Sequence, residues 1–188
     1  MKKLIMWNLI TLDGFFEGGR RWDLSFHDLV WNDELEDFSI EQLRSADSLV
    51  FGRITYEGMA DYWPTAEGEG ETASSMNNIS KLVCSRTLTN ANWNHTTIVR
   101  DAVAEITKLK QQGNGNLFVF GSGNLSQTLT NHNLFDEYRL LIAPVLLGKG
   151  RKLFNEDLKS QHLKLLETRT LKSGGVILRY APVLEKQA

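Results

Sequence analysis

The sequence predicts an α/β fold with a mixed, mostly parallel central sheet that is flanked by helices and carries a C-terminal antiparallel hairpin. Four short apolar runs alternate with stretches of helical spacing, which is the pattern of parallel strands joined by helical crossovers. Near the C-terminus, two runs with a period of two surround Ser173-Gly174-Gly175, which is typical of a hairpin. The 188 residues show no repeat and no long linker, so we expect a single domain over residues 1–188.

The expected strands are apolar runs that end at a turn-forming or polar residue. They cover residues 3–11, 48–51, 81–85, 117–120 and 138–143, followed by the hairpin strands around 163–171 and 176–180. Apolar residues spaced three to four positions apart predict helices over 33–46, from 53 to about 60, from about 101 onward and after Gly123. Residues 64–75 are rich in Gly, Glu, Ser and Thr, and we expect a mobile loop there.

Composition argues against several classes of protein. The net charge is −2 and there is no dense Lys/Arg run, so a nucleic-acid partner is not expected. The apolar start is interrupted by Asn8 and ended by Asp13, which is too short for a signal peptide or a membrane span. The single cysteine, Cys84, excludes an internal disulfide and fits the cytoplasm, where we expect an inert buried thiol. The four histidines are dispersed, so no metal site is expected.

Two strand–helix junctions carry glycines that could admit a phosphate. At the first, Gly52 precedes Arg53 and Thr55 at the start of a helix, where free N–H groups and a guanidinium suit an anion. The same turn could also be purely structural. At the second, Gly121 and Gly123 flank a serine before the next helix, so the backbone could approach a pyrophosphate closely. This run comes late in the chain and lacks the third glycine, so we reject a Rossmann fingerprint and keep the phosphate contact.

Two further strand ends carry polar residues. Ser85-Arg86-Thr87 follows an expected strand, and its hydroxyl and guanidinium could clamp a second phosphate or simply form a solvated turn. This stretch contains no acid, which favours NADPH over NADH, because an NADH site usually places a carboxylate on the ribose. Asp13, before Gly14, either forms a turn or places a polar group beside a cofactor's reactive ring.

The order of these elements resembles the dihydrofolate reductase-like family, in the branch that includes the reductase domain of bacterial riboflavin biosynthesis. The matching pieces are Thr11-Leu12-Asp13-Gly14, Phe51-Gly52-Arg53-Ile54-Thr55-Tyr56-Glu57, Lys81-Leu82-Val83-Cys84-Ser85-Arg86-Thr87-Leu88, Phe120-Gly121-Ser122-Gly123-Asn124-Leu125, and Asp136-Glu137-Tyr138-Arg139-Leu140 running to Pro144-Val145-Leu146-Leu147-Gly148-Lys149-Gly150. The resemblance spans nearly the whole chain. It implies a dihydrofolate reductase-like fold and an NADPH-dependent oxidoreductase.

The resemblance also implies a set of site residues. Those assigned to the cofactor are Gly52, Arg53, Thr55, Ser85, Arg86, Gly121, Ser122, Gly123, Asn124 and Leu125. Asp13 would be the catalytic residue beside the nicotinamide, and Trp31 would contact the substrate. A homodimer is implied as well, with residues 144–154 as part of the contact.

The expected substrate is a small heterocycle, pterin-like or ribityl-pyrimidine-like, or another compound that the sequence does not identify. The choice stays open because no acid in residues 26–35 aligns with the substrate-orienting acid of true dihydrofolate reductases. A competing interpretation is a non-catalytic nucleotide- or folate-analogue-binding protein on the same fold.

Overall fold

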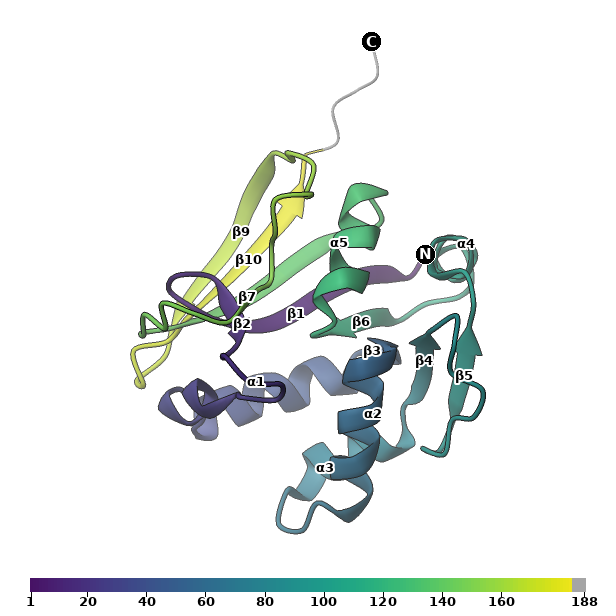
Figure 1. The fold of residues 1–188 in the computed structure, drawn as a ribbon, viewed down its shortest axis with the longest axis horizontal. Helices are drawn as coiled ribbons and strands as arrows, with labels where there is room; N and C mark the ends of the chain where they lie inside the picture. Colours follow the sequence, from purple (N-terminus) through teal and green to yellow (C-terminus); the bar gives the residue numbers. More distant parts are fainter. Residues whose placement is uncertain (184–188) are drawn as a thin grey trace.

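The computed structural model describes residues 1–183 and is built around one large mixed sheet. The strands lie side by side in the order β5 (Thr96–Val99), β4 (Ser80–Cys84), β3 (Ala46–Gly52), β6 (Asn116–Phe120), β1 (Lys3–Thr11), β7 (Glu137–Ala143), β10 (Val176–Pro182) and β9 (Leu163–Thr170). The six strands from β5 to β7 are parallel, and β10 and β9 are antiparallel. The predicted α/β fold with a C-terminal hairpin is confirmed (Figure 1).

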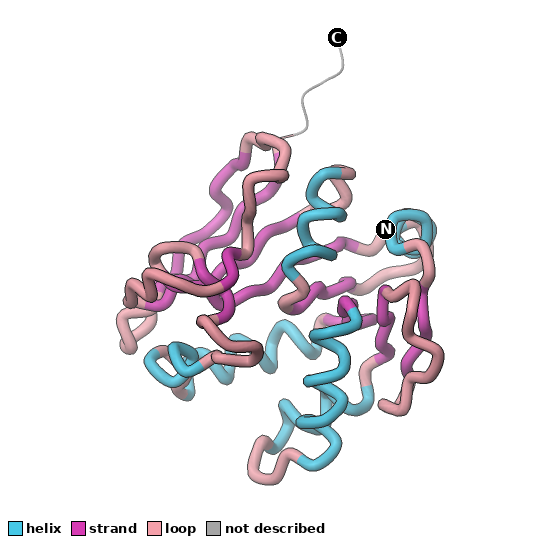
Figure 2. The backbone as a smooth tube through the Cα atoms, in the orientation of Figure 1, coloured by secondary structure: helices cyan, strands magenta, loops and turns pink. Residues whose placement is uncertain are grey.

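Helices cover both faces of the sheet, as Figures 1 and 2 show. The helices are α1 (Asp33–Arg44), α2 (Arg53–Tyr62), α3 (Gly70–Asn78), α4 (Ala102–Lys110) and α5 (Gly123–Asn131), with the short 3-10 helices η1 (Ser25–Leu29) and η2 (Trp63–Thr65). A small two-stranded sheet pairs β2 (Phe15–Glu17) with β8 (Arg151–Lys152). Residues of α1, α2, α3 and η1 join one hydrophobic cluster, and residues of α4 and α5 join the other.

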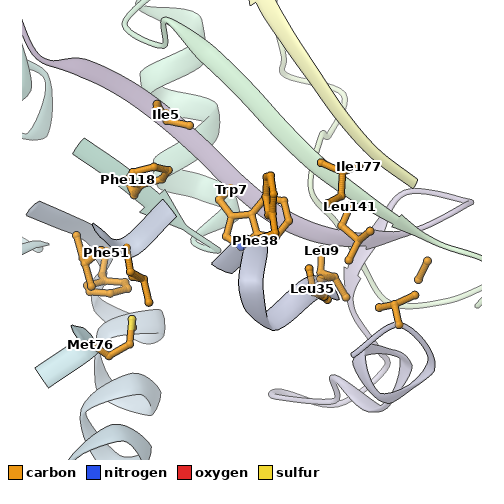
Figure 3. Packing of buried hydrophobic residues seen from close by; sticks show 14 of the residues in the cluster. Ile5, Trp7, Leu9, Leu35, Phe38, Phe51, Met76, Phe118, Leu141 and Ile177 are labelled. Carbon is orange, nitrogen blue, oxygen red and sulfur yellow. The ribbon is translucent and has the colours of Figure 1, made fainter. Parts of the chain in front are cut away.

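The central strand β1 is apolar along most of its length because both of its faces are covered. Ile5, Trp7 and Leu9 point into the cluster under α1 and α3, where the Trp7 ring lies 5.3 Å from the ring of Phe38 (Figure 3). Alternate residues of the strand pack against α4 and α5. A strand with this burial cannot shift by one residue, so the end of β1 is held firmly in place.

Two elements differ from the sequence expectation. Residues 64–75, expected to be a mobile loop, contain η2 and the first part of α3. Helix α3 is held there because Thr72 and Met76 are buried and Arg44 of α1 donates to both carboxylate oxygens of Glu71, each at 2.7 Å. The edge strand β5 was not expected, since it is only four residues long and follows a polar stretch.

A fully buried lysine joins β4 to its neighbours. The ammonium of Lys81 donates to the carbonyl oxygens of Asn77, Ile79 and Asn94 at 3.0, 2.8 and 3.1 Å. It also lies 4.4 Å from the centre of the Trp93 ring. Three carbonyls at the end of α3 and in the loop before β5 are therefore satisfied by one side chain.

Within residues 1–183, no helix is long and apolar enough to cross a membrane. The same residues contain no group of three or more His, Cys, Asp or Glu side chains arranged to hold a metal ion.

Candidate functional site

One large cavity of about 1250 Å³ lies at the carboxyl ends of the parallel strands. We divide its lining into two halves by the elements that supply it. The junction half comes from the ends of β3, β4, β5 and β6 and the helix starts that follow them. The aromatic half comes from the end of β1, the region of η1, helices α1 and α3, and the second part of α2. In open α/β sheets this edge is where ligands bind.

The junction half presents two helix N-termini that no side chain of the described residues caps. Helix α2 begins after Gly52 and α5 after Ser122, and neither has an acid in its first turn. By contrast, α1 and α4 are capped by the side chains of Asn32 and Asp101. An uncapped start leaves backbone N–H groups and the positive end of the helix dipole directed at the cavity, which suits an anion.

The hydroxyl of Ser122 is not available to cap α5 because it bridges to the other junction. Its Oγ accepts the Gly52 N–H at 2.7 Å and donates to Thr55 Oγ1 at 2.8 Å. Ser122 adopts the left-handed conformation at φ 60°, and a Cβ at position 52 would lie 3.1 Å from its hydroxyl, so glycine permits this close approach. The Ser122 hydroxyl therefore joins the two predicted junctions, which lie 70 residues apart in the sequence.

Three arginines line the junction half, and they differ in what they contact. Arg53 pairs with Glu57 at 2.8 Å, one turn along α2. Arg100 donates to the carbonyl of Ser85 at 2.7 Å. The exposed guanidinium of Arg86 has no hydrogen-bond or ion-pair partner within residues 1–183. It is therefore the arginine best able to take a phosphate without breaking an existing contact.

The other polar residues of this half shape the backbone. Ser85 Oγ accepts the N–H groups of Thr87 and Leu88 at 3.2 and 2.9 Å, so it forms the turn that presents Arg86. Burial raises the pKa of Cys84, which also lines the cavity, to about 12, so it stays a neutral thiol. Sequence analysis did not identify Arg100 as a site residue, because it did not predict strand β5, which ends just before Arg100. The β-branched run Thr96-Thr97-Ile98-Val99 could have indicated that strand.

Four tryptophans line the aromatic half: Trp7, Trp22, Trp31 and Trp63. Trp31, the expected substrate contact, is 45% exposed on this wall. Trp22 has a positive φ of 63° and packs against α2 at Gly58, where a Cβ would overlap its indole ring. A glycine is therefore needed at position 58 for Trp22 to reach the cavity.

The aromatic half also contains polar atoms that are buried without a partner. Among residues 1–183 these are Asn8 Nδ2, His27 Nε2, Gln42 Nε2 and Thr72 Oγ1. These four residues line the cavity, but the atoms themselves are almost completely closed off from solvent, so a ligand can reach them only if the wall shifts. None of these four residues could be singled out from the sequence, because each is an ordinary polar residue in an amphipathic or apolar segment.

Asp13 does not line the cavity in the described part of the chain, although we expected it beside the cofactor ring. Its carboxylate accepts hydrogen bonds from Thr11 Oγ1 at 2.6 Å and from the backbone N–H groups of Leu147 and Gly148 at 3.0 and 2.7 Å. These hydrogen bonds, led by the one from Thr11, lower the pKa of Asp13 to about 2. The geometry thus gives Asp13 the role of holding the turn after β1 to the segment after β7.

The other expected site residues do come together. Those that line the junction half are Gly52, Arg53, Thr55, Ser85, Arg86, Gly121, Ser122, Gly123, Asn124 and Leu125. The sequence therefore located the strand ends that surround the cavity, and the fold adds Arg100 and most of the aromatic half.

The chain is similar to known proteins over nearly its whole length. The chain is 31% identical over 185 residues to the uncharacterized protein YyaP of Bacillus subtilis, covering 95% of this chain and 94% of that one. A solved structure named for riboflavin biosynthesis, from Shewanella sp. PV-4, superposes with a TM-score of 0.78 at 22% identity, over 97% and 99% of the two chains.

A third match has a composite name. The Thermotoga maritima protein named as a diaminohydroxyphosphoribosylaminopyrimidine deaminase and 5-amino-6-(5-phosphoribosylamino)uracil reductase superposes with a TM-score of 0.69 at 13% identity. The match covers 97% of this chain and 57% of that one. At these identities the two solved structures show the shared fold. The model of the RibD C-terminal domain family matches residues 2–177, and this protein belongs to that family.

Proposed function

We propose that the protein is an NADPH-dependent reductase that passes a hydride to a small heterocyclic substrate of the pterin or ribityl-pyrimidine type. NADPH supplies the hydride, and the protein supplies binding, orientation and electrostatics. The observation that carries the proposal is the convergence on one cavity of two uncapped helix N-termini and of Arg86, which has no partner within residues 1–183.

The residues of the junction half fit the charges of a dinucleotide phosphate. The first N–H groups of α5, at Gly123, Asn124 and Leu125, suit the pyrophosphate together with the start of α2. Arg86 suits the 2′-phosphate, because a guanidinium fork can donate two parallel hydrogen bonds to phosphate oxygens. Asp101 lines the cavity too, but its carboxylate caps α4 through the N–H of Ala104 at 3.0 Å.

The aromatic half supports a flat second ligand. The four tryptophans on its wall offer apolar surfaces against which a flat ring can pack. The uracil reductase named for the Thermotoga maritima structure acts on a ring of this kind, which supports a heterocyclic substrate here.

The alternative is a nucleotide- or folate-analogue-binding protein that does not turn over. Reduction needs a proton source as well as a hydride. The observation that favours the alternative is that Glu17, on β2, is already engaged by the Trp22 N–H at 2.7 Å and by Arg151 at 3.0 Å. Asp28, which is exposed and also lines the cavity, is the carboxylate that a catalytic role would then use.

Tryptophan fluorescence provides a direct test, because four indoles line the cavity. Titration with NADPH should quench the emission at micromolar concentrations, and NADP⁺ should compete. Subsequent addition of pterins or ribityl-pyrimidines should oxidise NADPH, measured as loss of its absorbance. Quenching without oxidation of NADPH across such a panel supports the binding protein, and no quenching at all contradicts both.

The homodimer stays a prediction. Leu146, in the segment 144–154, is 70% exposed, and the edge strand β9 exposes Leu163, Leu165 and Leu166. Exposed apolar residues on an edge strand are features that a second copy would cover. Sedimentation at micromolar concentration should give the mass of two chains, and the mass of one chain would contradict the prediction.

A further inference from the structure

A second, smaller cavity of about 420 Å³ lies beside the β2–β8 sheet, and we call it the basic pocket. Two segments line it, residues 17–21 and residues 149–151. They meet where Glu17 pairs with Arg151 across the two strands, although these residues are 134 positions apart in the sequence. The basic pocket is therefore formed by the tertiary fold and not by a single loop.

Glycines allow the two segments to pack closely. Gly150 has a φ of 148°, and a Cβ at this position would overlap the backbone carbonyl oxygen of Glu17. A Cβ at Gly18 would overlap the Asp23 carboxylate, and the Gly18 N–H donates to the Asp23 carbonyl oxygen at 2.8 Å. The backbone around the pocket is thus held in one arrangement, which brings the side chains of both segments together.

Four cations line the basic pocket: Arg20, Arg21, Lys149 and Arg151. The exposed side chains of Arg20 and Lys149 have no hydrogen-bond or ion-pair partner within residues 1–183. Arg21 makes one exposed contact of 3.3 Å with Glu57 on α2, and a contact of this kind neutralises little of its charge. The pocket therefore gathers cations that the described part of the chain leaves largely free.

One acid of the described residues, Glu17, lines the basic pocket, and both of its oxygens are engaged. Oε2 accepts from Arg151 at 3.0 Å, and Oε1 accepts from the Trp22 N–H at 2.7 Å. Four cations against one carboxylate leave a surplus of three positive charges in the lining, although the whole chain has a net charge of −2. Like charges around one pocket repel one another, and an anion between them removes that repulsion.

The donors in the pocket suit a phosphate group. A guanidinium can donate two parallel hydrogen bonds to phosphate oxygens, and a lysine adds a point charge. Arg151 gives one N–H group to Glu17 and keeps others for a ligand. A phosphate group carries a charge of about −1.5 to −2 at pH 7, so it balances the surplus better than a carboxylate does.

We propose that the basic pocket binds a phosphate group through Arg20, Lys149 and Arg151. The pocket is separate from the junction half, so the proposal does not depend on the reductase function. Glu17 and Arg151 also line the main cavity, so the phosphate lies next to the aromatic half. It can arrive as a free ion or as the phosphate of a ligand whose ring occupies the aromatic half.

Isothermal titration calorimetry with inorganic phosphate tests the proposal. The protein is first saturated with NADP⁺, so that the junction half is occupied, and potassium chloride at the same ionic strength gives the baseline. Phosphate should bind with a dissociation constant on the order of 1 mM, as expected for two or three charge-assisted hydrogen bonds to exposed groups.

Two substitutions remove the free cations. Arg20→Gln and Lys149→Gln should each weaken phosphate binding by about threefold to tenfold, and the double variant should weaken it more than about tenfold. Because neither side chain has a partner within residues 1–183, folding should be unchanged, which a thermal melt reports. Lys164→Gln, on the exposed strand β9 and outside both cavities, removes the same charge and should leave phosphate affinity unchanged.

Riboflavin and flavin mononucleotide distinguish the two sources of the phosphate, because they share one ring system and differ by one phosphate. Flavin fluorescence anisotropy is measured with NADP⁺ present. Flavin mononucleotide that binds about tenfold more tightly than riboflavin, with the preference lost in the double variant, would assign the pocket to a phosphorylated ligand of the aromatic half. Binding of inorganic phosphate without such a preference would assign it to a free ion.

The proposal is overturned if phosphate shows no binding beyond the chloride baseline, or if the double variant binds phosphate as the wild type does. It is also overturned if Lys164→Gln weakens phosphate as much as the pocket variants do, because net charge alone would then explain the binding. If NADP⁺ does not bind, the reductase proposal fails, and the same three variants still show whether phosphate occupies the basic pocket.

Discussion

Removing the Ser122 hydroxyl should loosen the junction half of the cavity. In Ser122→Ala, the Gly52 N–H loses its acceptor and Thr55 loses its donor, at contacts of 2.7 and 2.8 Å. Alanine and serine share a similar strain in the left-handed conformation at φ 60°, so the substitution isolates the two hydrogen bonds. The ends of β3 and β6 then lose the contact that holds the two helix starts together.

The magnitude follows from those two bonds. Leaving a partly buried N–H without an acceptor costs about 1–3 kcal/mol, and for a chain of this size that lowers Tm by roughly 3–10 °C. NADPH affinity should fall by about threefold to thirtyfold, because the backbone N–H groups of α2 and α5 are no longer held in one arrangement before binding.

Differential scanning fluorimetry gives Tm, and tryptophan quenching gives the NADPH dissociation constant. Ser74→Ala, on the exposed side of α3 with one long 3.4 Å contact, is the matched control and should leave both unchanged. A Ser122→Ala variant with the Tm and the NADPH affinity of the wild type would refute the bridging role.

Three further outcomes are expected. Asp13→Asn should lower Tm at pH 6 and leave NADPH affinity unchanged, and the difference from wild type should shrink as the pH falls from about 4 towards 2, where Asp13 becomes protonated; an unchanged Tm with lost turnover would restore a catalytic role. Lys81→Met should destabilise the fold by about 2 kcal/mol in urea denaturation, because three partly buried carbonyls lose their donor; a neutral result would contradict it. Gly58→Val should displace Trp22, shift the wavelength of the tryptophan emission and lower the affinity for substrate more than the affinity for NADPH. An equal loss of both affinities would argue for a general folding defect.

Much of the sheet could be predicted because the burial of a strand determines which residues it contains. Strands covered on both faces read as unbroken apolar runs, as in β1, and the C-terminal hairpin shows a period of two. The short edge strand β5 and helix α3 were missed, because their burial comes from tertiary neighbours. In α3 only two residues are buried, and a salt bridge to α1 holds the rest.

The site divides in the same way. The junction half was predictable because glycine and arginine at strand–helix turns are local features with a known physical purpose. The aromatic half was not, because Asn8, Gln42 and Thr72 become a site only when β1, α1 and α3 are brought together. Asp13 shows the reverse case: its local pattern fitted both a turn and a catalytic group, and the contact with residues 147 and 148, which the sequence did not indicate, adds a structural role.

The most direct test of the central claim is the preference for NADPH over NADH, measured in the wild type and in Arg86→Ala. Arg86 has no partner within residues 1–183, so its removal should not disturb the fold. A charge-assisted hydrogen bond contributes about 1.5–3 kcal/mol, so NADPH should weaken roughly tenfold to a hundredfold while NADH stays nearly unchanged. Arg53→Ala, by comparison, should weaken both. If the wild type binds the two cofactors equally, or if Arg86→Ala weakens both alike, the assignment of this cavity to NADPH is contradicted.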